Sequence, residues 1–107
     1  MLYKKNIEGY KSLIAGVNFK TLVYGTSTSL HEFKLTKGSI IPKHSHMHEQ
    51  TGYMISGKMM FVLKDGEFFS EPGDSWCIPG NVDHEVHVLE DSVVIEVFSP
   101  VRQEYLT

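Results

Sequence analysis

Cysteine is almost absent from this chain of 107 residues, and Cys77 is the only one. A lone cysteine excludes a disulfide within the chain and fits a protein of the reducing cytoplasm. No reactive motif surrounds Cys77, so we expect it to be a small buried side chain. The length is that of one small domain.

Long apolar runs and an excess of positive charge are also missing. No stretch of about 18 apolar residues occurs, so the sequence predicts no membrane-spanning helix. The early lysines precede no uninterrupted apolar run, so no signal peptide is expected. The net charge of −3 offers no basic surface for nucleic acid. Neither a membrane nor a nucleic acid is therefore an expected partner.

A long apolar stripe at helical spacing is absent as well. Short runs rich in Val, Ile, Phe, Tyr and Thr alternate instead with turn signals such as Asp65-Gly66 and Pro79-Gly80. The expected strands cover residues 18–25, 28–35, 52–57, 58–66, 74–80, 84–89 and 92–98. Evenly spaced short strands predict an all-β sandwich or barrel. At the end, Ser99 is suited to cap and Pro100 to begin a short C-terminal helix.

What the sequence does contain is a dense group of imidazoles in the stretch KHSHMHEQ. In a strand, His44 and His46 project from one face with their Cα atoms roughly 6.6 Å apart. Two imidazoles placed in this way can bind one metal ion at about 2.1 Å. A straight strand would carry Gln50 about 20 Å from His44, so we expect a turn that brings Gln50 back beside His46.

The same turn determines where the other side chains of this stretch would lie. His48 would lie at its tip, near the mouth of the site, as a bystander or a contact with substrate. Glu49 is an alternative ligand to Gln50. It has the wrong parity, however, to face inward together with Gly52 and Met54. Gly52 would leave open space close to the metal.

A fourth ligand must come from elsewhere in the chain. His84 begins a predicted strand and shares its face with Val86 and Val88, an apolar row that marks the inner face. His87 shares its face with Glu85, so we expect it to be exposed. His84 is therefore the predicted fourth ligand.

These residues resemble the first of the two motifs of the cupin superfamily. Gly38, His44, His46, Gln50 and Gly57 match the pattern G-x5-H-x-H-x3-E-x6-G, with Gln in place of Glu.

The second cupin motif, G-x5-P-x-G-x2-H-x3-N, is also present in most of its positions. Gly73, Pro79 and His84 match it, whereas Asn81 replaces the usual Gly and Val88 the usual Asn. The two motifs are separated by 15 residues, the short spacing of compact cupins.

The resemblance implies one cupin domain over residues 1–107, folded as an antiparallel β-barrel of jelly-roll type. It also implies a metal ion in the lumen of the barrel. The implied ligands are His44, His46, Gln50 and His84. The alternative is a cupin that has lost its metal and whose histidines merely line a pocket.

A glutamine ligand changes the charge of such a site. Three neutral imidazoles and an amide leave a divalent ion with its full +2 charge, which polarises substrate oxygens and favours an anionic substrate such as a carboxylate. We expect one divalent ion, namely Zn, Ni, Mn or Fe(II), since imidazole and amide oxygen suit these metals.

The C-terminal stretch EVFSPVRQEYL supplies further candidates. Glu96 and Phe98 share one face of the last strand, opposite Val93 and its apolar neighbours. If that apolar face packs elsewhere, Glu96 faces the lumen and is available for proton transfer. Arg102 could hold a carboxylate through two hydrogen bonds. The alternatives are a solvated Glu96 and an Arg102 on the surface of the terminal helix.

HSHMHEQTGYMISG and EVFSPVRQEYL together resemble the KdgF group of small cupins. Members of that group convert cyclic 4,5-unsaturated uronates to the linear keto form, and they carry a glutamine ligand and the stretch D-V-F-S-P-P-R. The resemblance implies that Glu96 and Arg102 are catalytic and that Phe98 and Arg102 bind substrate, with His48 a further candidate contact. Glu96 in place of Asp and Val101 in place of Pro are departures.

Three functions follow from these patterns. They are a metal-dependent enzyme acting on a small sugar acid, a non-catalytic binding or sensing module, and a dioxygenase of the quercetinase or acireductone type. We also expect a homodimer, for which the apolar face of Met59, Phe61 and Leu63 is a candidate. His31 is expected in the core or at an interface, and Trp76 is expected to serve packing.

Overall fold

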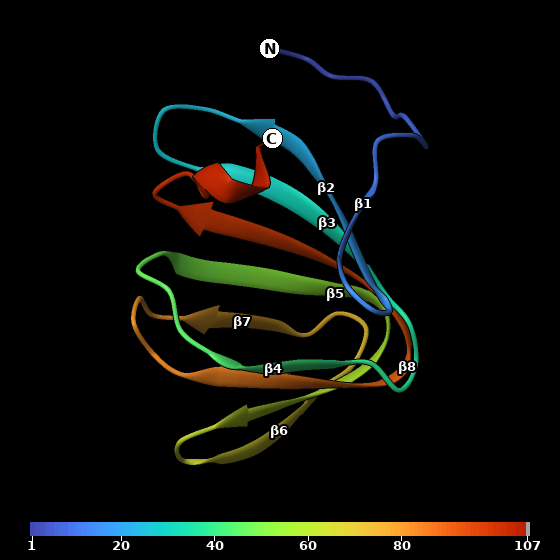
Figure 1. Cartoon of the computed structure of the whole chain (residues 1–107), viewed down its shortest axis with the longest axis vertical. Helices are drawn as coiled ribbons and strands as arrows, with labels where there is room; N and C mark the ends of the chain where they lie inside the picture. The colour runs from blue at the N-terminus through green and yellow to red at the C-terminus, as the bar shows by residue number, and fades with distance from the viewer. Residues whose placement is uncertain (107) are drawn as a thin grey trace.

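Eight antiparallel strands form one sheet that curls into a barrel (Figure 1). The computed structural model describes residues 1–106. The strands are β1 (Lys11–Ile14), β2 (Val17–Tyr24), β3 (Ser29–Leu35), β4 (Ile40–His44), β5 (Glu49–Leu63), β6 (Gly66–Ser70), β7 (Ser75–Ile78) and β8 (His84–Ser99). The all-β barrel predicted from the short alternating runs is confirmed.

The two long strands, β5 and β8, hold the barrel together. The main path of the sheet is β1-β2-β3-β8-β5-β6, while β4 pairs with β8 and β7 with β5. The first half of β8 pairs with β4 and its second half with β3, so β8 belongs to both walls of the barrel. β5 does the same by pairing first with β7 and then with β6.

The sequence predicted that one strand ends at Gly57 and another begins at Lys58, and this prediction is wrong. β5 continues through Gly57, which has a φ of +96° and lies among shifts of the β5–β8 register. A Cβ at Gly57 would lie 2.2 Å from the Ser92 Oγ atom, so only glycine fits. The Ser92 hydroxyl accepts from the Lys58 N–H at 3.1 Å and donates to the Glu90 carbonyl at 2.7 Å. The strand therefore bends where a break was expected.

Alternation along the strands separates an inner from an outer face, as the period of two predicts. On β8 every second residue from His84 to Val88 and from Ser92 to Phe98 is buried. The buried apolar residues include Val17, Phe19, Phe33, Leu35, Met54, Met59, Phe61, Ile78, Val86, Val88, Val94, Phe98 and Tyr105.

Two predictions about faces are wrong. Met59 and Phe61 are buried inside the barrel at 2% and 5% exposure, so they cannot form a dimer surface. Cys77 is exposed rather than buried, because β7 turns its neighbours Trp76 and Ile78 inward and Cys77 outward.

The predicted C-terminal helix is shorter than expected. Only a 3-10 turn, η1 (Gln103–Tyr105), forms, and Arg102 just before it is in an extended conformation without a side-chain cap. Ser99 ends β8 instead of capping a helix. The turn packs through the buried Tyr105, so burial of one aromatic ring, not helix propensity, sets its position.

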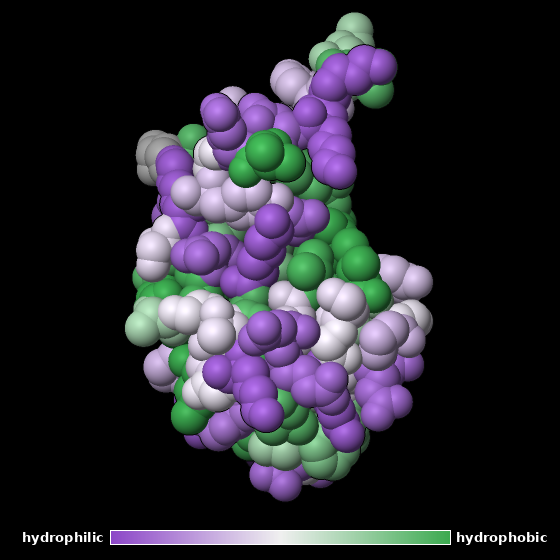
Figure 2. Space-filling view, turned by 90° about the vertical axis from the view of Figure 1, so that its right-hand side faces the viewer, coloured by the Kyte–Doolittle hydropathy of each residue, from purple (hydrophilic) through white to green (hydrophobic). Residues whose placement is uncertain are grey.

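The segment ahead of β1 projects from the body of the molecule (Figures 1 and 2). Met1, Leu2, Tyr3 and Ile7 in this segment are exposed. Within residues 1–106 there is no helix of the length and hydropathy that crossing a membrane requires.

Candidate metal centre

Three imidazoles meet at one end of the lumen. His44 ends β4 and is the register partner of His84 at the start of β8, and His46 lies in the loop that follows β4. Each offers a ring nitrogen, and the three nitrogens lie within 4.8 Å of one another. The sequence therefore grouped the right histidines, although the strand ends at His44 and not beyond His46.

Backbone carbonyl groups fix the orientation of all three rings. Each Nδ1 atom lies 2.9–3.0 Å from a carbonyl oxygen, and a carbonyl can only accept, so each Nδ1 carries the proton. The pairs are His44 with Pro42, His46 with His48, and His84 with Val82. The three Nε2 atoms thus keep their lone pairs, which is the arrangement that a metal ion requires.

Burial keeps two of these imidazoles neutral. It lowers the pKa of His46 to about 4 and also lowers the pKa of His84, and the positive charge of Arg102 acts in the same direction on both. The Nε2 atom of His84 is buried without a hydrogen-bond partner among the described residues. A buried lone pair without a donor is suited to binding a cation.

Gln50 completes the donor set. The turn brings it back as predicted, and its Oε1 atom lies 3.0 Å from the Nε2 atom of His46. Both atoms are acceptors in the arrangement above. Two ligands at about 2.1 Å from one ion and at right angles to each other are about 3.0 Å apart. The separation therefore fits two neighbouring ligands of one cation.

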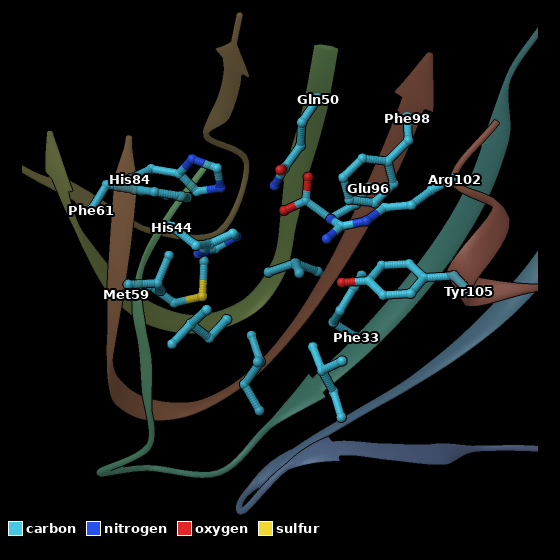
Figure 3. A pocket seen from close by; sticks show the side chains of 15 residues that line it. Phe33, His44, Gln50, Met59, Phe61, His84, Glu96, Phe98, Arg102 and Tyr105 are labelled. Carbon is cyan, nitrogen blue, oxygen red and sulfur yellow. The ribbon is translucent and has the colours of Figure 1, made fainter. Parts of the chain in front are cut away.

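The amide of Gln50 is oriented by Glu96. Gln50 and Trp76 both donate hydrogen bonds to the Glu96 carboxyl group. Figure 3 shows the Gln50 amide beside the Glu96 carboxyl group. Because a carboxylate accepts and the amide nitrogen donates, the amide oxygen is left to face His46. The residues present thus fit a divalent ion held by three imidazoles and one amide oxygen.

Glu96 itself faces the lumen. It is 5% exposed and lies opposite Gly52 in the β5–β8 register, so the alternative of a solvated glutamate is wrong. The Trp76 Nε1 atom is 3.2 Å from both carboxyl oxygens. Burial raises the pKa of Glu96 to about 8, although the hydrogen bonds from Gln50 and Trp76 and the charge of Arg102 oppose this rise. Its carboxyl group can therefore exchange a proton near neutral pH.

Gly52 does not leave open space beside the metal, contrary to the prediction. A Cβ there would lie 2.1 Å from the Trp76 Nε1 atom, so the indole occupies that space. Trp76 was assigned to packing alone, and its hydrogen bonds to Glu96 were missed. The inward parity shared with Ile78 was the available signal.

Arg102 reaches the same end of the lumen. Its guanidinium carbon lies 4.8 Å from the Phe98 ring centre and 4.2 Å from that of Tyr105, and its Nε atom donates to Glu104 at 2.6 Å. The side chain is only 12% exposed, so the alternative of a surface arginine is wrong. Stacking between two aromatic rings fixes the plane of the guanidinium group.

These side chains surround a cavity of about 60 Å³. One water needs about 15 Å³ on this measure, so the cavity has room for roughly four waters. Its polar lining residues are His44, Gln50, His84, Glu96, Arg102 and Tyr105, most of which lie toward one end (Figure 3). Its apolar lining residues are Leu13, Phe33, Leu35, Ile41, Met59, Phe61, Val86, Val94 and Phe98. Tyr105 was not singled out from the sequence, because a helix-tolerant segment gave no reason to place its ring in the lumen.

Two members of the histidine-rich stretch lie apart from this cavity. Glu49 is exposed, so the geometry disfavours it as a ligand. His48 is buried against His46 and Phe98, with ring centres 5.6 and 6.2 Å away, but it does not line the cavity. Contact between His48 and a substrate thus stays a prediction.

Comparison with known proteins agrees with this geometry. Residues 31–99 match the family described as Cupin domain. The pectin degradation protein KdgF of Dickeya dadantii is 28% identical over 91% of this chain and 90% of its own length. The structure of KdgF from Halomonas sp. superposes with a TM-score of 0.87 at 28% identity, over 92% of this chain and 94% of that one.

A more partial likeness connects the chain to an oxygenase. The acireductone dioxygenase of Bacillus cytotoxicus is 33% identical over 60 residues. That match spans 51% of this chain and 35% of the dioxygenase.

Proposed function

This chain belongs to the cupin domain family, and from that premise we propose that it is a metal-dependent enzyme that opens and ketonises 4,5-unsaturated uronates. The three-histidine cluster indicates a metal-binding cupin. The KdgF relatives, one of them described as a pectin degradation protein, support the choice of substrate. The observation that carries the proposal is the buried Glu96 carboxyl group in the same cavity as His44, His84 and Arg102.

His44, His46, Gln50 and His84 would hold the metal ion. When bound, the ion would supply a Lewis acid that retains its full +2 charge, because all four ligands are neutral. Imidazole nitrogen and amide oxygen are ligands that Zn, Ni, Mn and Fe(II) all accept.

Arg102 binds the substrate carboxylate in this proposal. Its guanidinium group lines the cavity with its plane fixed between Phe98 and Tyr105, so it can offer two parallel N–H groups. Phe98 would pack against the sugar ring. An anionic substrate would thus be fixed with its double bond toward Glu96.

Glu96 carries the proton. The anomeric hydroxyl gives up its proton, the bond from C1 to the ring oxygen breaks to leave an aldehyde and an enolate, and the enolate takes a proton at C4 to become the ketone. One proton leaves and one arrives, so a single carboxyl group with a pKa near 8 can serve both steps. No water or redox partner is consumed.

The direct test is to incubate metal-loaded protein with unsaturated galacturonate and follow loss of the double bond. We expect a rate well above that of buffer with free metal. An equal rate in both samples contradicts the proposed activity.

The metal requirement has a matched pair of variants on β8. His84→Asn removes a proposed ligand, and we expect metal affinity and turnover to fall at least about a hundredfold. His87→Asn changes an outward histidine bonded to Glu85 and should leave both unchanged. Metal content per chain, measured on protein purified without an affinity tag, checks this. Equal metal content in both variants would argue for a cupin that has lost its metal.

The partial match to acireductone dioxygenase favours a second candidate, a metal-dependent dioxygenase. Oxygen consumption with Fe(II), Ni or Mn would identify it. Binding of a sugar acid without turnover, unchanged in Glu96→Gln, would instead identify a sensing module.

The proposed homodimer now involves a different surface. On the outer face of the sheet, Val93, Ile95 and Val97 of β8 are partly exposed, and Tyr53 and Ile55 of β5 are 50% and 47% exposed. Covering this apolar area is a physical reason for two copies to associate. Light scattering of the purified protein gives the mass, and Tyr53→Lys should favour the monomer.

A further inference from the structure

His31 is a fully buried histidine that lies outside the metal centre. His31 on β3 is 0% exposed, and both of its ring nitrogens are bonded to hydroxyl groups. Its Nδ1 atom is 3.0 Å from the Thr21 Oγ1 atom, and its Nε2 atom is 2.8 Å from the Ser29 Oγ atom. An apolar residue would fill the same space without these bonds, so the bonds themselves need an explanation.

The direction of every hydrogen bond in this group is determined. The Thr21 hydroxyl lies 2.7 Å from the Tyr105 carbonyl, which can only accept, so Thr21 must accept from the His31 Nδ1–H. The Arg102 backbone N–H can only donate, and it donates to the Ser29 Oγ at 3.2 Å. The Ser29 hydrogen is then directed to the His31 Nε2 atom.

A single chain of hydrogen bonds results. It begins at the Arg102 N–H, passes through Ser29, His31 and Thr21, and ends at the Tyr105 carbonyl. Each member uses its donor once and in the same direction, so the neutral Nδ1–H form of His31 satisfies every partner.

The two ends of this chain bracket the turn η1. Arg102 and Tyr105 are the residues that present a guanidinium group and a phenol to the cavity. The Tyr105 ring also packs edge-on against His31, with ring centres 5.4 Å apart. Few other polar contacts tie this segment to the barrel, because Arg102 otherwise bonds to its near neighbour Glu104.

We propose that His31 is a positioning residue, which, through Ser29 and Thr21, holds the C-terminal segment so that Arg102 and Tyr105 stay directed at the substrate. The kinetic consequences rest on the proposed function, whereas the structural consequences do not. His31 itself touches neither the cavity contents nor the metal ligands.

The structural consequence is measured by amide hydrogen exchange in the intact protein. Ser29→Ala removes the acceptor of the Arg102 N–H and should speed exchange of that amide roughly fivefold, the effect of one buried hydrogen bond. Thr21→Val removes the bond to the Tyr105 carbonyl, so it should loosen η1 and speed exchange of the Tyr105 amide, which bonds to the Arg102 carbonyl within that turn. His31→Leu leaves these two bonds possible but removes the ring that orients both hydroxyl groups and packs on Tyr105, so it should speed exchange of both amides. Exchange of the Val94 amide in the core should change less than either. Uniform acceleration at all three amides, or none at Arg102 and Tyr105, overturns the inference.

The kinetic consequence is a split between KM and kcat. A loosened Arg102 binds the substrate carboxylate less well, so Thr21→Val and Ser29→Ala should raise KM several-fold with little change in kcat. Thr21→Ser keeps the hydroxyl and should restore the wild-type KM. His87→Asn, outside the network, should leave KM unchanged. A fall in kcat with unchanged KM, or no rescue by Thr21→Ser, overturns the positioning role.

The two arms separate failure of this inference from failure of the proposed function. If the wild-type protein does not act on unsaturated uronates, but the exchange rates change as expected, the proposed function fails and the role of His31 stands. If the protein is active and exchange is unchanged, the reverse holds.

Discussion

The two ends of the lumen differ in chemistry although the same strands build them. Both ends of β8 lie at the polar end, where His84 starts the strand and Glu96 and Phe98 stand near its finish (Figure 3). The middle of β8 contributes Val86 and Val94 to the apolar end. A long strand that bends thus brings residues far apart in sequence to one site and leaves its middle as an apolar floor.

Different forces hold the two ends. At the polar end, directed hydrogen bonds fix each side chain, from the carbonyls behind the histidines to the indole behind Glu96. At the apolar end, side chains such as Met59 are held by burial alone. Changes at the polar end should therefore alter chemistry, and changes at the apolar end should alter stability.

The largest expected effect is on the chemistry, from Glu96→Gln. The amide keeps the size of the side chain and an acceptor for the Trp76 N–H, but it cannot carry a proton. We expect kcat on unsaturated uronate to fall about 10²- to 10⁴-fold, with metal content unchanged. Steady-state kinetics and metal analysis on the same preparation check this. A variant with wild-type kcat would place the proton transfer elsewhere.

The apolar end is tested by Met59→Ala. Met59 is 2% exposed, so its truncation should lower the free energy of unfolding by about 2–5 kcal/mol through lost burial and a new cavity. Glu67→Ala on the neighbouring strand β6 changes an exposed side chain and should cost roughly 0.5 kcal/mol or less. Urea unfolding of both variants gives the difference. Loss of metal affinity in Met59→Ala at full folding would show that the two ends are not separable.

Some features of the site and the strands could be predicted from the sequence and others could not. His44, His46, Gln50 and His84 could be grouped because parity, a required turn and two motifs all agreed. The inner face of β8 followed from alternation, whereas the face of Met59 and Phe61 was wrongly assigned to a dimer surface. At Cys77 alternation was not applied, and that prediction failed too. The bend at Gly57 was taken for a break, because a glycine in a β-run is typical of both.

What could not be predicted depends on contacts between distant segments. Nothing local to Trp76 indicates that its indole fills the space above Gly52, since those residues are brought together only by the β5–β7 pairing. Tyr105 is placed by Phe19, Phe33 and the His31 ring, from two strands near the start of the chain. A single sequence does not contain that information in any short stretch.

An intermediate effect is expected from pH. Burial, aided by the charge of Arg102, lowers the pKa of His31 from 6.5 to about 4. Between about pH 6.5 and pH 4, His31 is protonated in the unfolded chain but neutral in the folded protein. Lowering the pH through this range therefore favours unfolding. His31 should account for up to about 3 kcal/mol of this loss.

His46 and His84 shift in the same direction, so the contribution of His31 must be isolated by substitution. His31→Gln stays neutral at every pH. Urea unfolding of metal-free protein at pH 7.5 and pH 4.5 should show a smaller loss of stability in the variant than in the wild type. Equal losses would mean that His31 takes up its proton without cost in the folded protein.

The smallest effect concerns Trp76, which contacts both a polar and an apolar residue of the lumen. Its N–H bonds to Glu96, and its ring packs on Phe61 with centres 4.9 Å apart. Trp76→Phe keeps an aromatic ring and removes the donor, so kcat should fall about tenfold with metal retained, the value of one hydrogen bond to a carboxyl group. Phe61→Leu makes the opposite change and should lower stability while kcat is kept. If Trp76→Phe lowers only stability, the indole serves packing alone and Glu96 is oriented by Gln50.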